Sequence, residues 1–115
     1  MKKVAWWLIG VGFFLVLTTG KALAHPPGSL IVSLMPEGKI RVQVSHTVND
    51  PAKHFINRVV IFKDGQQLAE KSFGTQTDKT GLDVEIPVEG LQKGQTIQVE
   101  ADCNIFGSLK KTFTL

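Results

Sequence analysis

The stretch KIRVQVSHTV, from Lys39 to Val48, shows the pattern on which the fold depends. Three apolar side chains and then a histidine occupy every second position: Ile40, Val42, Val44 and His46. A period of two is typical of a β-strand that has one face on a core and the other in solvent, because successive side chains of a strand point to opposite faces. His46 is therefore predicted to continue the buried face of this strand.

The same alternation recurs in short segments from Ser29 to the C-terminus, and no stretch has a sustained helical period. Turn residues separate the segments, among them Pro36-Glu37-Gly38 and the Asp64-Gly65 pair of a tight hairpin. The predicted strands cover about residues 29–35, 39–48, 55–63, 66–73, 82–88, 95–102 and 108–114. Seven short strands within about 90 residues predict an all-β fold, a seven-stranded immunoglobulin-like β-sandwich over residues 25–115.

Residues 1–24 are predicted to be a secretory signal peptide. Lys2 and Lys3 precede the apolar run VAWWLIGVGFFLVL, and Ala22-Leu23-Ala24 places small residues where a signal peptidase cuts. The apolar run is shorter than the roughly 20 residues that cross a bilayer, which disfavours the alternative of an uncleaved anchor. We therefore expect cleavage after Ala24, export to the periplasm, and a mature protein that begins at His25 and has no stable membrane anchor.

The charge balance and the motifs exclude several functional classes. The full chain has 13 Lys and Arg residues against 10 Asp and Glu, but three of the lysines lie in the predicted signal peptide. The mature chain is therefore close to neutral, which argues against nucleic acid as a partner. The sequence also has no nucleophile motif, no paired-carboxylate motif and no phosphate-binding glycine loop. These absences argue against conventional hydrolases, kinases and dehydrogenases.

All three histidines and the only cysteine of the chain are predicted to lie at one end of the sandwich. If successive strands run in opposite directions, the ends of even-numbered strands lie beside the starts of odd-numbered strands. His46 ends the second strand, His54 precedes the third, Cys103 ends the sixth and His25 precedes the first. Three imidazoles and a thiolate suit a transition metal such as iron, copper or zinc. Each residue also has an ordinary explanation. Cys103 would be a buried thiol, His46 a hydrogen-bonded core histidine, His54 a loop residue and His25 part of a frayed terminus.

Two of these residues carry further arguments. Cys103 cannot form a disulfide within the chain, and metal ligation would explain a lone thiol in an exported protein. Cleavage before His25 would free an α-amine beside its imidazole, and copper favours such a pair of nitrogen ligands.

The segments around these residues follow one another in a recognisable order: Val44-Ser45-His46-Thr47, Asn49-Asp50-Pro51, His54-Phe55-Ile56, and Ala101-Asp102-Cys103-Asn104-Ile105-Phe106-Gly107. Together they resemble the iron-binding domain of the desulfoferrodoxin and superoxide reductase family, which has His-Pro, His-Tyr-Ile and Cys-Asn-x-His-Gly segments. The resemblance covers most of the mature chain. It implies an immunoglobulin-like fold that holds a mononuclear, non-haem iron ion and reacts with superoxide.

The resemblance also implies a ligand set. His46, His54 and Cys103 match ligand positions of the family, and His25 could correspond to the ligand that precedes the first strand. The fourth histidine of the family falls at Phe106, which cannot ligate a metal. The Glu-Lys pair that precedes the first histidine in superoxide reductases would fall in the signal peptide. With these departures the resemblance implies a site of three histidines and one cysteine, without the lysine of the family pair.

Three hypotheses for the function follow. The first is an exported desulfoferrodoxin-like domain that binds iron, acts as a superoxide reductase-like oxidoreductase, and has a small oxidant or an electron-donor protein as its partner. The second is a copper-binding domain that uses the N-terminal His25. The third is a structural or interaction module without metal, in which the Phe106 ring fills the former site.

Overall fold

The computed structural model describes residues 25–115, and the predicted signal peptide over residues 1–24 lies outside them. Seven strands and no helix make up the described part of the chain. The strands are β1 (Ser29–Met35), β2 (Lys39–Ser45), β3 (Ile56–Lys63), β4 (Gln66–Ser72), β5 (Gly81–Pro87), β6 (Thr96–Cys103) and β7 (Ser108–Thr114). Within residues 25–115, accordingly, no helix is long and apolar enough to cross a membrane. The all-β, seven-stranded prediction is confirmed.

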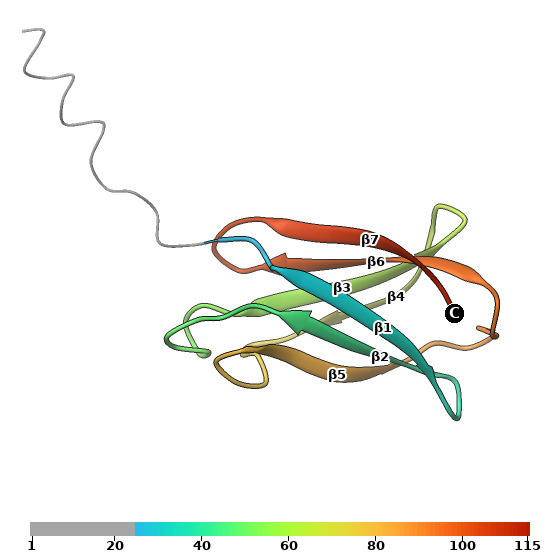
Figure 1. Ribbon diagram of the computed structural model, residues 1–115, viewed down its shortest axis with the longest axis horizontal. Helices are drawn as coiled ribbons and strands as arrows, with labels where there is room; N and C mark the ends of the chain where they lie inside the picture. Colours follow the sequence, from blue (N-terminus) through green and yellow to red (C-terminus); the bar gives the residue numbers. More distant parts are fainter. Residues whose placement is uncertain (1–24) are drawn as a thin grey trace, which may run out of the picture.

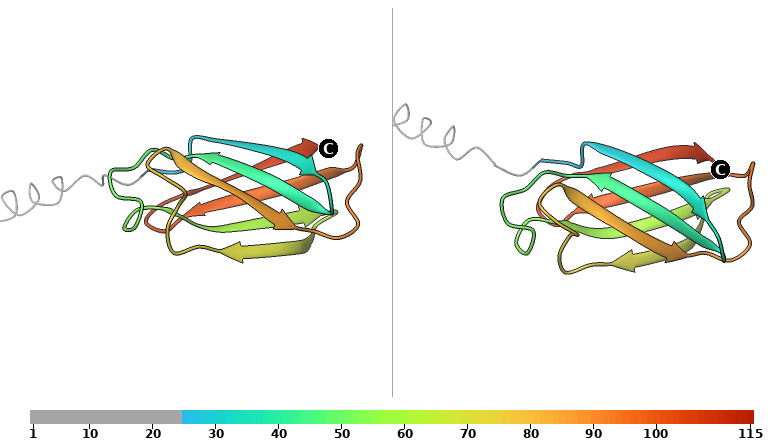
Figure 2. Two further views of the ribbon diagram at one scale, coloured as in Figure 1. Left: turned by 90° about the horizontal axis from the view of Figure 1, so that it is seen from below. Right: turned by 60° about the horizontal axis from the view of Figure 1, so that its bottom comes forward.

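The strands form two antiparallel sheets that face each other as a sandwich (Figures 1 and 2). One sheet has the order β1-β2-β5 and the other has the order β4-β3-β6-β7. The alternating residues predicted to face inward are buried between them, and they include Ile40 and Val42 from β2 and Ile97 and Val99 from β6. Burial of aliphatic side chains from both sheets is the main stabilising contribution to this fold, because each fully buried Val or Ile contributes about 1.5–3 kcal/mol.

The strand β2 ends at Ser45, three residues earlier than the alternation predicts. The cause is a change of hydrogen-bond partner: the backbone N–H groups of His46 and Val48 donate to the carbonyls of Thr80 and Lys79, in the loop before β5. This irregular pairing keeps the inward direction of the pattern, since His46 and Val48 are both buried. The other strand bounds differ from the predicted ones by one residue at most.

The strand ends that carry the candidate ligands meet at one end of the sandwich, as alternating strand directions predict. Ser29 at the start of β1 lies opposite Ser45 at the end of β2. Ile56 at the start of β3 lies opposite Cys103 at the end of β6. Figure 1 shows the entry into β1, the segment after β2 and the β6–β7 loop at this same end.

Candidate metal centre

The three histidines form one cluster at this end of the sandwich. One imidazole nitrogen from each of His25, His46 and His54 lies within 4.8 Å of the others. The ring centroids are 4.7 to 5.1 Å apart. The three residues come from separate segments: one before β1, one directly after β2 and one before β3. The predicted convergence of the histidines is confirmed.

His46 is the buried member of the cluster, with 1% of its surface exposed. Its Nδ1 lies 2.9 Å from Oε1 of Gln76, and its Nε2 lies 3.3 Å from the carbonyl oxygen of His25. Both ring nitrogens are therefore close to oxygen atoms, and the ring has a fixed orientation.

His54 is positioned by the turn that begins at Asp50. The carbonyl of Asp50 accepts a hydrogen bond from the His54 N–H at 3.0 Å, and the Asp50 carboxylate accepts one from the Ala52 N–H at 3.0 Å. The turn directs the imidazole into the cluster, where its Nε2 is buried and has no hydrogen-bond partner among the described residues. A buried nitrogen without a partner costs about 1–3 kcal/mol, and coordination to a metal would satisfy it.

Burial and the neighbouring histidines favour the neutral form of His54. Burial lowers the pKa of His54 below its ordinary value of 6.5, and the positive charges that His46 and His25 carry when protonated lower this pKa further. A neutral imidazole is the form that ligates a metal, so the environment favours the ligating form.

His25 is held by a short N-terminal arm, residues 25–28. Its Nε2 lies 3.0 Å from the carbonyl oxygen of Thr47, and the N–H of Gly28 donates to the Ser45 carbonyl at 2.8 Å. Pro26 packs on Gly107 so closely that a Cβ at Gly107 would lie 2.7 Å from the Pro26 Cβ. An open pocket of about 280 Å³ lies beside the cluster, and its walls include His25, His54 and Asp50.

Cys103 lies at the predicted end of β6 and is buried, but its sulfur lies outside the group that the three histidines form. Its Sγ accepts a hydrogen bond from the Ile105 N–H at 3.4 Å. The neighbouring Asn104 side chain accepts from the Phe55 N–H at 2.8 Å and donates to the Lys53 carbonyl at 3.0 Å. These bonds join the Cys103 loop to the segment that carries His54.

The expectation that Phe106 fills the former site is wrong. The Phe106 side chain is 61% exposed, and the neighbouring Ile105 is 55% exposed. Residues 104–107 form the turn between β6 and β7, and side chains of that turn lie on the surface. The space among the histidines is therefore not filled by the Phe106 ring.

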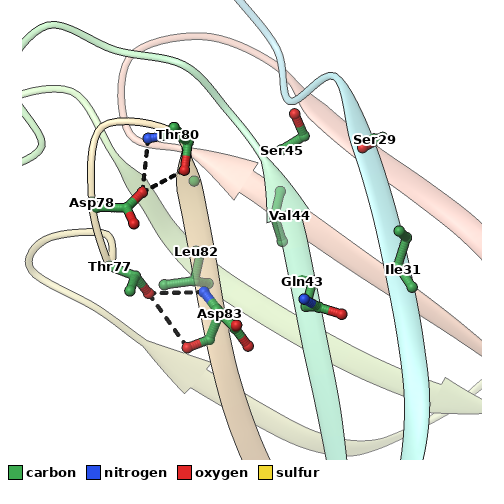
Figure 3. A pocket seen from close by; sticks show the side chains of 11 residues that line it. Ser29, Ile31, Gln43, Val44, Ser45, Thr77, Asp78, Thr80, Leu82 and Asp83 are labelled. Carbon is green, nitrogen blue, oxygen red and sulfur yellow. Dashed lines mark hydrogen bonds between the residues drawn. The ribbon is translucent and has the colours of Figure 1, made fainter.

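A second pocket, of about 340 Å³, has two carboxylates in its walls but no imidazole or thiol. It lies on the three-stranded sheet and the loop before β5, and none of its walls is a histidine or a cysteine (Figure 3). Its polar groups bond to one another: the Thr77 hydroxyl accepts from the Asp83 N–H at 2.8 Å, and the Thr80 hydroxyl donates to Asp78 at 2.6 Å. The histidine cluster therefore remains the candidate site.

The sequence does not predict that Gln76 is buried beside the histidine cluster. It lies in the loop between β4 and β5, a stretch of polar residues with no periodicity, yet only 3% of its surface is exposed. A glutamine in a loop is usually exposed, so nothing local to the sequence marks this one as buried.

The sequence matches no protein-family model and no curated protein. Among solved structures, the fold is similar to the superoxide reductase (1Fe-SOR) from Giardia intestinalis, with a TM-score of 0.54 and 18% identity over 80% of this chain and 98% of that one. A variant of the superoxide reductase neelaredoxin from Archaeoglobus fulgidus, in its reduced form, covers 87% of this chain and 97% of its own at 18% identity and a TM-score of 0.46. At this identity the first likeness speaks for the fold alone: the chain folds as a superoxide reductase-like β-sandwich that carries a three-histidine cluster able to bind a metal.

Proposed function

We propose that this protein is an exported metal-binding protein in which His25, His46 and His54 hold a single iron ion. The observation that carries the proposal is the convergence of three imidazoles from three separate segments, one of them with a buried nitrogen that has no other partner within residues 25–115. Every histidine of the chain belongs to the cluster, so no other set of imidazoles competes for the ion.

The donor set fits such an ion. Imidazole nitrogens suit iron, copper and zinc, and a rigid β scaffold fixes the positions from which they are offered. The superoxide reductase-like fold supports iron over the other two. We propose Cys103 as a further ligand, whose sulfur would approach the ion when the site is loaded. The N–H of Ile105 would then donate to the thiolate, and such hydrogen bonds tune the potential of a metal site.

The chemistry proposed is the one-electron reduction of a small oxidant, with superoxide as the first candidate. A ferrous ion supplies the electron when bound. The chain's own residues hold the ion, and the open pocket beside His25 and His54 gives a small molecule access to it. Repeated turnover needs an electron-donor protein to restore the reduced state, and that partner is part of the proposal.

Iron binding tests the proposal directly. The full-length precursor is expressed, and the protein is isolated from the periplasmic fraction and loaded anaerobically with Fe(II). We expect one iron per chain, a large loss of affinity after His54→Leu, and a weaker loss with a changed absorption spectrum after Cys103→Ser. A protein that binds no stoichiometric iron contradicts the proposal. Unaltered iron affinity after Cys103→Ser removes only the cysteine from the ligand set.

Copper is the second candidate, because His25 lies inside the cluster and would carry a free α-amine after cleavage at Ala24. Inserting one alanine between Ala24 and His25 keeps the imidazole and moves the amine. A strong loss of Cu(II) affinity in this variant supports ligation by the amine. Equal Cu(II) affinity before and after the insertion excludes the amine as a ligand.

Export is tested by the same preparation. The mass of the periplasmic protein is expected to equal that of residues 25–115. A mass that includes residues 1–24, or a protein found only in the cytoplasm, contradicts cleavage after Ala24.

A further inference from the structure

Gln76 joins two strand ends beneath the histidine cluster. Its Nε2 donates to the His46 carbonyl at 2.7 Å and to the Asp78 carbonyl at 2.9 Å. Its Oε1 accepts from the Ile56 N–H at 3.1 Å and lies 2.9 Å from Nδ1 of His46. The side chain is buried, and four contacts satisfy all of its donors and both of its acceptor sites.

The backbone partners fix which end of this amide is oxygen. The two carbonyls can only accept, so they need the NH₂ group, and the N–H of Ile56 can only donate, so it needs the oxygen. Turning the amide over would set its oxygen against two carbonyls and its NH₂ against an N–H. The atom facing His46 is therefore Oε1, an acceptor, and Nδ1 of His46 must carry the proton.

We propose that Gln76 is a positioning residue that holds neutral His46 in the Nδ1–H tautomer, which leaves Nε2 unprotonated, with a lone pair that a metal can take. In the other tautomer Nε2–H would donate to the His25 carbonyl, 3.3 Å away, and the lone pair needed by the ion would be lost. Gln76 thus disfavours the one neutral tautomer of His46, Nε2–H, in which the nitrogen facing His25 is protonated. This inference rests on the proposed function of the cluster.

Gln76 should affect metal affinity as other residues do that hydrogen-bond to a ligating histidine without touching the ion. Such partners set the tautomer and orientation of the ring, and their loss typically weakens metal binding about 10- to 100-fold. The other two contacts of Gln76, to Ile56 and Asp78, lock the amide itself, so the tautomer is set before any ion arrives.

The test reads the tautomer without metal. The ¹⁵N shifts of the His46 imidazole are measured in the metal-free protein from full-chain expression, at about pH 8, above the ordinary histidine pKa of about 6.5. We expect Nδ1–H in the unaltered protein and Nε2–H after Gln76→Met, which removes the acceptor. Gln76→Glu should restore Nδ1–H, at a cost in stability because its second oxygen faces two carbonyls. The control Gln66→Met, at an exposed site in β4, should leave His46 unchanged.

Metal affinity gives the second readout. Zn²⁺ is expected to bind about 10- to 100-fold more weakly to Gln76→Met than to the Gln66→Met control. Nε2–H in the unaltered protein, or Nδ1–H retained after Gln76→Met, overturns the role of Gln76. If Gln76→Met does not fold, the unaltered protein and Gln76→Glu still decide the tautomer. Nδ1–H in a protein that binds no metal instead contradicts the proposed function and leaves the tautomer assignment standing.

Discussion

Replacing Gly107 by alanine should displace His25 through its neighbour Pro26. The new Cβ would lie 2.7 Å from the Pro26 Cβ and 3.0 Å from its Cα. Carbon atoms pack at about 3.5–4.0 Å, so Pro26 must move by about 1 Å. Metal–ligand distances tolerate only about 0.2 Å, and His25 precedes Pro26 directly. We therefore expect Gly107→Ala to weaken metal binding at least about tenfold, a value at the lower end of the losses seen when the surroundings of a ligand are changed.

The backbone at Gly107 adds a second cost that a control can remove. Its φ is +87°, a region in which an alanine costs about 1–2 kcal/mol. Gly90 has a φ of +84° and no atom within 4 Å of the Cβ that alanine would add. Gly90→Ala therefore has the same backbone strain without the collision. Crowding against Pro26 should cost Gly107→Ala about 1–3 kcal/mol beyond this control.

The assay compares the two variants in parallel. Urea unfolding of the metal-free proteins gives the two losses of stability, and a Zn²⁺ titration gives the two affinities. Equal Zn²⁺ affinity for Gly107→Ala and Gly90→Ala would refute the reasoning, because it would mean that the contact between Pro26 and Gly107 does not set the position of His25.

Two further predictions concern stability. Because the pKa of His54 is lowered in the folded protein, the unfolded chain binds a proton at higher pH than the native state does. The free energy of unfolding of the metal-free protein should therefore be unaffected by His54 protonation above about pH 6.5. Below about pH 6.5 it should fall with falling pH until the pH passes the His54 pKa of the folded protein. Urea midpoints measured across this range should fall less steeply for His54→Leu, and an unchanged slope would show that His54 is not responsible. In the core, Ile61→Ala should cost about 2–5 kcal/mol because Ile61 is 0% exposed, whereas Ile31→Ala, at a 56% exposed site, should cost less than about 0.5 kcal/mol; similar unfolding free energies for the two variants would contradict this assignment of the core.

The strands and the histidine cluster were predictable because both follow from the alternation of side chains. The period of two in residues 39–46 identifies β2 and the direction of His46 together, and the direction of successive strands then brings His25 and His54 to the same end. These features depend on order along the chain and on strand geometry, which a single sequence contains.

The features that the sequence did not predict depend on contacts between distant segments. β2 stops at Ser45 because the loop before β5 supplies Thr80 and Lys79 as hydrogen-bond partners, and the periodicity of β2 gives no information about that loop. Gln76 is buried by the same meeting of segments. The exposure of Phe106 follows from the shape of the β6–β7 turn, and its apolar character alone suggests the opposite. The ligand role of Cys103 stays a prediction.

The cluster draws on both halves of the sandwich, because His46 follows β2 of the three-stranded sheet and His54 leads into β3 of the four-stranded sheet. A bound ion would therefore cross-link the two sheets at this end of the sandwich. The cross-link would oppose local unfolding here, so amide hydrogen exchange should slow in β2 and β3 together when the metal is bound. The rate at which a chelator withdraws the ion would then report how often the two sheets part.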